Sequence, residues 1–118
     1  MASRKLRSAP GEQAAGTKLK TLLGVCKRMV KEVSSYEKEV VTNEARVQKM
    51  RDEGKDPYSI RKQEEVLQES YMMIPDSKAR LENSIQDLEA CLNECKDAEG
   101  LDQAVVDEAK ALVAAQQA

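Results

Sequence analysis

Apolar residues recur every three or four positions between about Lys18 and Glu53, which is the spacing of one face of a helix. That face consists of Leu19, Leu22, Cys26, Met29, Val33, Tyr36, Val40, Asn43, Val47 and Met50, with Asn43 as its polar member. A pattern that keeps step over so many turns predicts one long helix over about residues 18–53, packed along its length against another helix.

A second long helix is predicted over about residues 57–98. Its apolar positions recur at intervals of seven, at Ile60, Leu67, Ile74, Leu81, Leu88 and Cys95. Between the two helices, Gly54 suits the position just past a helix end, Asp56 suits an N-cap, and Pro57 suits a first turn. So short a connection predicts that the two helices run antiparallel.

Pro75 lies inside the second helix, and two interpretations compete. If Pro75 opened a separate helix, its N-cap would be Ile74, a poor capping residue, and the series of seven would have no reason to stay in register. If the helix continues, it spans about 60 Å against about 50 Å for the first. We favour a continuous helix kinked at Pro75, because proline donates no N–H to the Tyr71 carbonyl and its ring displaces that carbonyl.

The rest of the chain predicts a third helix and a tail. Asp102 is the expected N-cap of a helix over about residues 103–117. Residues 1–17 show no periodicity and carry Arg4, Lys5 and Arg7, which is typical of a disordered basic tail. We therefore predict an all-α protein, in which residues 18–118 form a single antiparallel three-helix bundle, a coiled-coil-like rod.

Two methionines precede the proline. At about 100° per residue, Met72 lies about 160° around the helix from Ile74, so it should be exposed unless something covers it. Beside Met73 and Pro75, an exposed methionine forms an adaptable surface for contact with another protein.

Composition argues against catalysis and against a membrane or nucleic-acid role. The chain has no histidine and no glycine-rich phosphate loop, so we expect no enzyme and no cofactor. Cys91 and Cys95 supply at most half a thiolate metal site, and we interpret them as small core residues. No apolar run approaches the roughly 20 residues that cross a bilayer, and no recognition fold accompanies the basic tail. An odd count of three cysteines without a framework spacing indicates a reducing compartment, and we expect the cytoplasm.

Several motifs together resemble the tubulin-binding cofactor A family. They are Lys27-Arg28-Met29-Val30-Lys31-Glu32, Tyr36-Glu37-Lys38-Glu39, and the run from Lys62 to Ser70 that continues into Met72-Met73-Ile74-Pro75-Asp76 and Arg80-Leu81-Glu82. The resemblance covers roughly residues 18–98. It implies a three-helix bundle with a kinked second helix, and a cytoplasmic, cytoskeleton-associated chaperone that captures β-tubulin after its release from the chaperonin.

The resemblance also implies where β-tubulin binds, chiefly on the convex face of the second helix. The expected contact residues are Arg61, Glu65, Glu69, Met72, Met73, Pro75 and Asp76, with Lys27 and Arg28 on the first helix. Other tubulin-folding cofactors are further candidate partners. Tyr71 departs from the family, whose members often have a basic residue there, so an electrostatic contact is lost or replaced by an aromatic one.

A structural role is the alternative to a tubulin cofactor. In that hypothesis the chain is a homodimeric coiled-coil adaptor, and its exposed apolar stripe is its own dimer interface. The sequence leaves both a monomer and a homodimer open.

Overall fold

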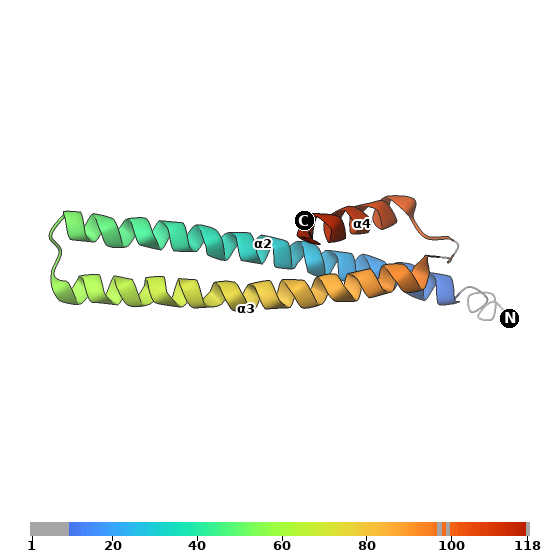
Figure 1. Ribbon diagram of the computed structural model, residues 1–118, viewed down its shortest axis with the longest axis horizontal. Coiled ribbons are helices and arrows are strands. Elements are labelled where there is room, and N and C mark those ends of the chain that lie inside the picture. The colour runs from blue at the N-terminus through green and yellow to red at the C-terminus, as the bar shows by residue number, and fades with distance from the viewer. Residues whose placement is uncertain (1–9, 97, 99, 118) are drawn as a thin grey trace. The chain divides into compact units, whose positions relative to one another are not determined.

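A computed structural model of the chain describes residues 10–96, 98 and 100–117. Three helices account for most of them: α2 is Pro10–Asp52, α3 is Pro57–Cys95, and α4 is Gln103–Gln117 (Figure 1). No strand occurs within these described ranges, so the all-α, three-helix prediction is confirmed. None of the three helices combines the length and the hydropathy of a membrane-crossing segment.

The first helix begins earlier than predicted. It starts at Pro10 rather than near Lys18, so residues 10–17 are helical and do not belong to a disordered tail. Proline suits the first position of a helix, because an N–H at that position would have no acceptor within the helix. A Cβ added at Gly16 would lie 3.7 Å from Leu101 Cδ2, so this early turn packs against the segment before α4. Residues 1–9 of the expected tail lie outside the described residues.

The connection between α2 and α3 confirms the predicted caps. Gly54 has a positive φ of 68°, and the amides of Gly54 and Lys55 donate to the carbonyls of Arg51 and Met50 at 3.1 and 3.0 Å. This is the Schellman arrangement, with Gly54 just past the helix end. Asp56 then caps α3, since its carboxylate accepts the Ser59 amide at 2.8 Å. The Ser59 amide and the Ser59 hydroxyl both donate to this carboxylate, and these two hydrogen bonds hold the pKa of Asp56 below its ordinary value.

The second helix runs without a break through Pro75. This continuity confirms the interpretation that Pro75 lies within one helix rather than at the start of a new one. Two residues later, the Ser77 hydroxyl is completely buried and donates to the Ile74 carbonyl at 3.0 Å. The kink at Pro75 stays a prediction, resting on the displaced Tyr71 carbonyl. The helix ends at Cys95, three residues before the predicted end.

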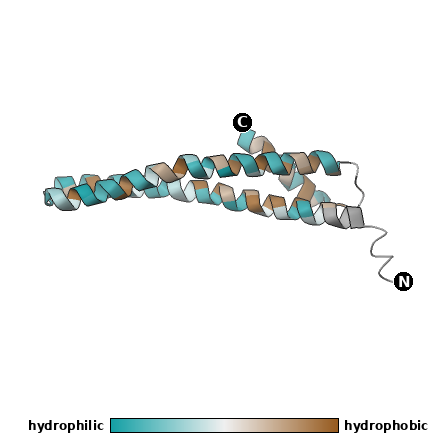
Figure 2. Ribbon diagram, turned by 90° about the horizontal axis from the view of Figure 1, so that it is seen from below, coloured by the Kyte–Doolittle hydropathy of each residue, from teal (hydrophilic) through white to brown (hydrophobic). Residues whose placement is uncertain are grey.

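The chain divides into two compact units, and each is described by itself. The terminal unit joins the part of α2 up to Arg28 with the part of the chain from Glu82 onward, which includes α4. The middle unit is Met29–Leu81, which contains the rest of α2, the α2–α3 connection and most of α3. Along both long helices, hydrophilic and hydrophobic residues alternate (Figure 2).

The terminal unit is a three-helix packing with an apolar interior. Its buried apolar residues are Leu19, Leu23, Cys26, Ile85, Leu88, Cys91, Cys95, Ala109 and Val113. On its surface, Lys27 on α2 pairs with Glu108 on α4 at 2.8 Å. The small side chain of Ala109 is completely buried, which lets the short α4 approach the two long helices closely.

The middle unit consists of the antiparallel pair α2 and α3, with a thinner interior. Its buried apolar residues are Val33, Val40, Val47 and Leu81, and it also buries the polar residues Asn43, Ser70 and Ser77. The Asn43 side-chain amide donates to Ser70 Oγ at 2.6 Å, and Ser70 donates in turn to the Val66 carbonyl at 3.1 Å. Both buried groups are therefore satisfied.

Candidate functional site

Four of the predicted contact residues form one line along the outer side of α3 in the middle unit. Arg61, Glu65, Met72 and Asp76 are separated by four, seven and four residues, which places them within an arc of about 60°. All four are exposed. The side chain of Met72 is 65% exposed, which confirms the prediction that it faces away from the helix pair. We call this line the α3 outer face.

Three further predicted residues flank the α3 outer face. Pro75 lies on one side of Met72 and is exposed. Glu69 and Met73 lie on the other side, toward α2, and Met73 is 37% exposed. The α3 residues predicted from the sequence thus gather on one continuous surface of the middle unit, although their role in binding stays a prediction.

An open groove of about 880 Å³ runs between α2 and α3 next to Met73. Its α3 side is Val66, Glu69, Ser70, Met72 and Met73, and its α2 side is Ser35, Lys38, Glu39, Thr42, Asn43 and Arg46. The methionines supply flexible apolar surface, and the α2 side supplies hydroxyl and charged groups. Such a groove suits a protein surface of mixed polarity better than a small apolar ligand.

Exposed apolar side chains concentrate in the middle unit. Within the described part of the chain, the exposed large hydrophobic residues are Val41, Tyr58, Val66, Tyr71, Met72 and Met73. All six lie between Met29 and Leu81. Three of them line the groove, so apolar surface gathers where the sequence predicted a partner.

Some charges of the predicted surface are already paired within the protein. Asp76 accepts from Arg80 at 2.6 Å, and Arg80 also reaches Glu32 on α2 at 2.8 Å. Glu65 lies 4.0 Å from Lys62, whose ammonium group in turn lies 5.5 Å from the centre of the Tyr58 ring. A partner that binds Asp76 or Glu65 must compete with these contacts, so the unpaired methionines are the stronger candidates for the main contact.

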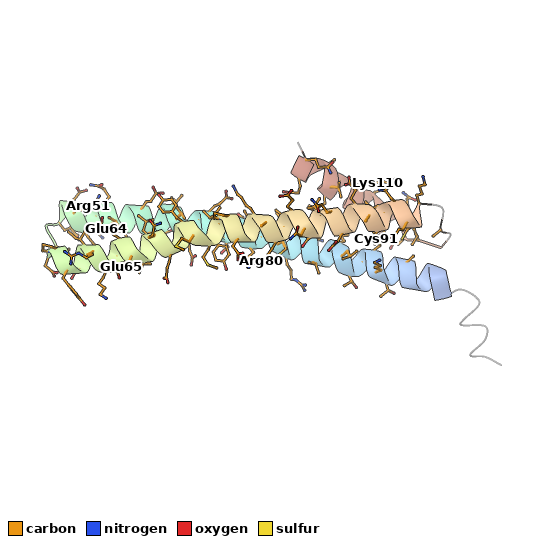
Figure 3. The ribbon with its side chains drawn as sticks, turned by 60° about the horizontal axis from the view of Figure 1, so that its bottom comes forward. Arg51, Glu64, Glu65, Arg80, Cys91 and Lys110 are labelled. Carbon is orange, nitrogen blue, oxygen red and sulfur yellow. The ribbon has the colours of Figure 1, made fainter. Side chains whose placement is uncertain are left out.

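The opposite side of the middle unit is closed by three polar pairs across α2 and α3. Arg51 meets Glu64 at 2.7 Å near the connecting turn (Figure 3), and Glu37 meets Lys78 at 4.0 Å. Midway between them, a hydrogen bond from Tyr71 to Glu44 raises the pKa of the Tyr71 hydroxyl. Successive pairs are seven residues apart on each helix. We call them the polar ladder, and Tyr71 belongs to it rather than to the α3 outer face.

Lys27 and Arg28 belong to a different unit from the predicted α3 residues. Both are exposed in the terminal unit, and Lys27 forms the ion pair with Glu108 described above. Their role in binding stays a prediction.

The cysteines lie in the interior of the terminal unit. Cys91 and Cys95 are buried with their sulfur atoms 3.7 Å apart, and Cys26 is also buried. Burial raises the pKa of Cys91 to about 11 and also raises that of Cys26. High pKa values keep the thiols protonated and poorly nucleophilic. Among the described residues, no three His, Cys, Asp or Glu side chains are placed to hold a metal ion.

A family model described as "Tubulin binding cofactor A" matches residues 14–113. The chain belongs to the tubulin binding cofactor A family. The resemblance seen in the motifs around Pro75 is thereby confirmed, and the match extends into α4, where the motifs themselves gave no support.

Named relatives of the family match most of the chain. Tubulin-folding cofactor A of Arabidopsis thaliana is 45% identical over 96 residues, which cover 81% of this chain and 85% of the relative. Human tubulin-specific chaperone A is 51% identical over 82 residues, covering 70% and 74%.

Solved structures of the family share the fold. The crystal structure of the Arabidopsis thaliana cofactor superposes with a TM-score of 0.78 at 43% identity, over 89% of this chain and 97% of that one. The tubulin-binding cofactor A structure from Leishmania major gives a TM-score of 0.74 at 27% identity, over 92% and 95%.

Sequence reasoning missed the second core row of α3. The row is Gln63, Ser70, Ser77, Ser84 and Cys91, again at intervals of seven, and its members are half-buried or buried. A search for apolar periodicity passes over serines. The signal was the heptad spacing of Ser70, Ser77 and Ser84, each three positions after a member of the apolar row and in step with Cys91, which was predicted to be a core residue. The polar ladder was missed for a different reason. Each of its pairs joins two helices, so the pattern along either helix alone does not reveal it.

Proposed function

We propose that the chain is a tubulin-folding cofactor that captures β-tubulin after its release from the chaperonin and holds it by reversible, stoichiometric binding. The contact surface is the α3 outer face with the adjoining groove. The action is in the cytoplasm, where it supports the assembly of tubulin complexes, and it requires no catalytic group or bound cofactor. Membership of the family supports tubulin as the partner.

The observation that carries the choice of surface is the exposure of Met72 next to Met73 and Pro75. Free β-tubulin has surface that α-tubulin covers in the heterodimer. A partly apolar, adaptable surface can cover such a region reversibly, because methionine side chains repack at little cost. In the described part of the chain, no other segment combines two exposed methionines with an adjoining groove.

The test is capture of β-tubulin by a variant carrying Met72→Asp and Met73→Asp. Two carboxylates in an apolar contact would be desolvated without partners, so we expect capture in a pull-down to fall at least about tenfold. Circular dichroism should show unchanged helicity, since both side chains face outward.

The matched control carries Ala104→Asp and Ala111→Asp. These changes also add two carboxylates at exposed positions, but both residues lie on α4 in the terminal unit. Capture by the control should match that of the unmodified protein. Unchanged capture by the methionine variant would show that the α3 outer face is not the main contact.

Self-association through the same surface is the competing role. Sedimentation of the purified protein at low micromolar concentration separates the two. A monomer or a dimer that gives way to a β-tubulin complex supports the proposal. A tight dimer that persists in the presence of β-tubulin and does not bind it would replace the proposal with a dimeric coiled-coil adaptor.

A further inference from the structure

Between Lys31 and Lys49, the outward side of α2 carries basic residues, small polar residues and one alanine, and no acidic residue. The positions that share this side are Lys31, Ser34, Ser35, Lys38, Thr42, Ala45, Arg46 and Lys49. They recur every three or four residues, so at about 100° per residue they fall within an arc of roughly 120°. We call this surface the α2 basic stripe.

The cations of the α2 basic stripe are exposed and unpaired. Lys31, Lys38, Arg46 and Lys49 are all exposed, and none of them forms an ion pair with a described residue. The cations beside the polar ladder differ, since Arg51, Lys78 and Arg80 each meet a carboxylate. The four cations of the stripe are therefore available to carboxylates from outside the chain.

Acidic residues border the stripe on both sides. Glu32 and Glu39 lie along one edge of it, and Glu37 and Glu44 along the other. These carboxylates confine the positive surface to a strip no wider than the helix itself, about 10 Å. A wide polyanion such as a nucleic-acid duplex or an anionic membrane would meet the bordering carboxylates as well as the cations. A single polypeptide segment would meet the cations alone.

The surface along the stripe is also indented. An open hollow of about 390 Å³ is lined by Val30, Lys31, Ser34, Ser35 and Lys38. The larger groove next to Met73 continues from Lys38 through Thr42 to Arg46. Serine and threonine hydroxyls in these hollows donate hydrogen bonds to carboxylates and leave room for an incoming side chain.

We propose that the α2 basic stripe is a second docking surface, which adjoins the groove at Lys38, Thr42 and Arg46 and binds an acidic polypeptide segment of the protein held by α3. The identity of the partner as β-tubulin rests on the proposed function. The preference of the stripe for acidic polypeptide depends only on the residues of the stripe. Lys31 and Lys38 are about 10 Å apart along the helix, at 1.5 Å per residue. An extended segment covers the same length in three residues, so one with an acid at every third position fits the spacing.

The test compares two triple charge reversals. The stripe variant carries Lys31→Glu, Lys38→Glu and Arg46→Glu. The matched control carries Lys55→Glu, Lys96→Glu and Lys110→Glu, three exposed lysines outside the stripe that form no ion pair with a described residue (Lys110 is labelled in Figure 3). Each variant replaces three cations by three carboxylates, so the two have the same net charge. Helicity and thermal unfolding establish that both are folded.

The first measurement uses a fluorescent poly-L-glutamate peptide of about 20 residues in low salt, read by anisotropy. The stripe variant should bind at least about tenfold more weakly than the unmodified protein, and the control should lose much less. Equal losses would show that net charge alone governs binding and would overturn the proposal. Tighter binding of a duplex RNA or of phosphatidylserine vesicles than of poly-L-glutamate would overturn it as well.

The second measurement is capture of β-tubulin at two salt concentrations. The stripe variant should capture less than the control at about 50 mM salt, and the difference should shrink at about 300 mM because exposed charges are screened. Capture equal to that of the control at low salt would overturn the proposal. If the Met72→Asp, Met73→Asp variant loses β-tubulin but still binds poly-L-glutamate, the two surfaces act separately. If the unmodified protein captures no β-tubulin, the proposed function fails, and the poly-L-glutamate result still decides what the stripe binds.

Discussion

Asn43 and Ser70 form the one side-chain hydrogen bond between two buried residues of different helices in the described part of the molecule. A buried hydrogen bond contributes little net free energy, but leaving one partner unsatisfied is costly. Removing one member of the pair should therefore destabilise the protein more than replacing both members with apolar residues. A double-mutant cycle can measure this difference.

We predict that Ser70→Ala destabilises the protein by about 1–3 kcal/mol, because the Asn43 amide stays buried without its acceptor. Asn43→Leu combined with Ser70→Ala should recover most of that loss, since both polar groups are then replaced by apolar ones. Urea unfolding of the two single variants and the double variant measures the coupling. Strictly additive effects would contradict an energetic link between the two residues.

Tyr71 was expected from the sequence to depart from the family pattern, and the structure gives it a partner on α2. Its hydrogen bond to Glu44 raises the pKa of the phenol, so the neutral form is favoured in the folded state. The stability from this contact is present below the pKa of an unfolded tyrosine, about 10, and is lost as the pH rises through the higher folded value.

The loss of this stabilisation at high pH can be tested. The difference in urea midpoint between the unmodified protein and Tyr71→Phe should be largest near pH 8 and should shrink by pH 11. Comparing the two proteins at each pH cancels the titration of the lysines and of the other tyrosines. A difference that does not change with pH would show that the Glu44 contact has no influence on stability.

At the scale of the element, Pro75 is the main irregularity of α3. A helix interior is less stable by up to about 3 kcal/mol with proline than with alanine. We expect Pro75→Ala to raise the free energy of unfolding by as much as that, measured in urea. If β-tubulin capture falls while stability rises, the bend contributes to binding.

Gly24→Ala is the control for this change. Gly24 lies in α2, and a Cβ there would meet no atom within 4 Å, so alanine should add about 1 kcal/mol through helix propensity alone. Its capture of β-tubulin should stay unchanged. Lower capture by this control too would assign the loss to added stability instead of to the shape of α3.

The chemistry of one heptad row changes along each long helix. In the middle unit, Glu37, Glu44 and Arg51 of α2 pair with Lys78, Tyr71 and Glu64 of α3 as the polar ladder. In the terminal unit, the same heptad positions are apolar, with Leu23 on α2 and Ile85 and Leu92 on α3. The terminal unit also contains α4, which adds to its apolar interior through Ala109 and Val113.

Helix number, order and the inner caps were all predictable from the sequence, because periodicity and capping are local. Gly54, Asp56 and Asp102 each take the predicted role, the last by accepting the Ala104 amide at 2.9 Å. The start of α2 was not predictable in this way, since its first turns bear glycines and no apolar stripe. The Leu101 side chain, which is distant in sequence, approaches Gly16 closely enough to meet an added Cβ, and no local pattern predicts that approach.

The candidate site was predictable only in part. The exposure of Met72 follows from its angle on α3, and it is confirmed. The pairing of Asp76 with Arg80 and Glu32 involves a second helix, and so does the role of Tyr71 in the polar ladder. Such partners depend on the register of α2 against α3, which no single segment of the sequence specifies.

At the scale of the whole molecule, the interior is unevenly distributed. The terminal unit buries nine of the thirteen apolar core residues, whereas the middle unit buries the other four and all three buried polar residues. Regions that bury less apolar surface open more readily.

We predict that the backbone amides of α3 from Glu82 to Cys95 exchange with solvent at least about tenfold more slowly than those from Ile60 to Tyr71. Native-state hydrogen exchange followed by mass spectrometry measures the two segments in one experiment. Equal protection would mean that the helices open only together, as a single cooperative unit.

The row of small polar residues on α3 has a consequence for how the middle unit finds its alignment during folding. If α3 slid by one heptad in either direction, Asn43 would meet Gln63 or Ser77 in place of Ser70, and it would still find a polar partner. In the middle unit the apolar row is Ile60, Leu67, Ile74 and Leu81, so after such a slide each position would still hold a branched aliphatic side chain. The interior thus tolerates several alignments. The turn that contains Gly54 and Asp56 is too short to allow more than one of these alignments. The turn therefore sets the register of α3 against α2.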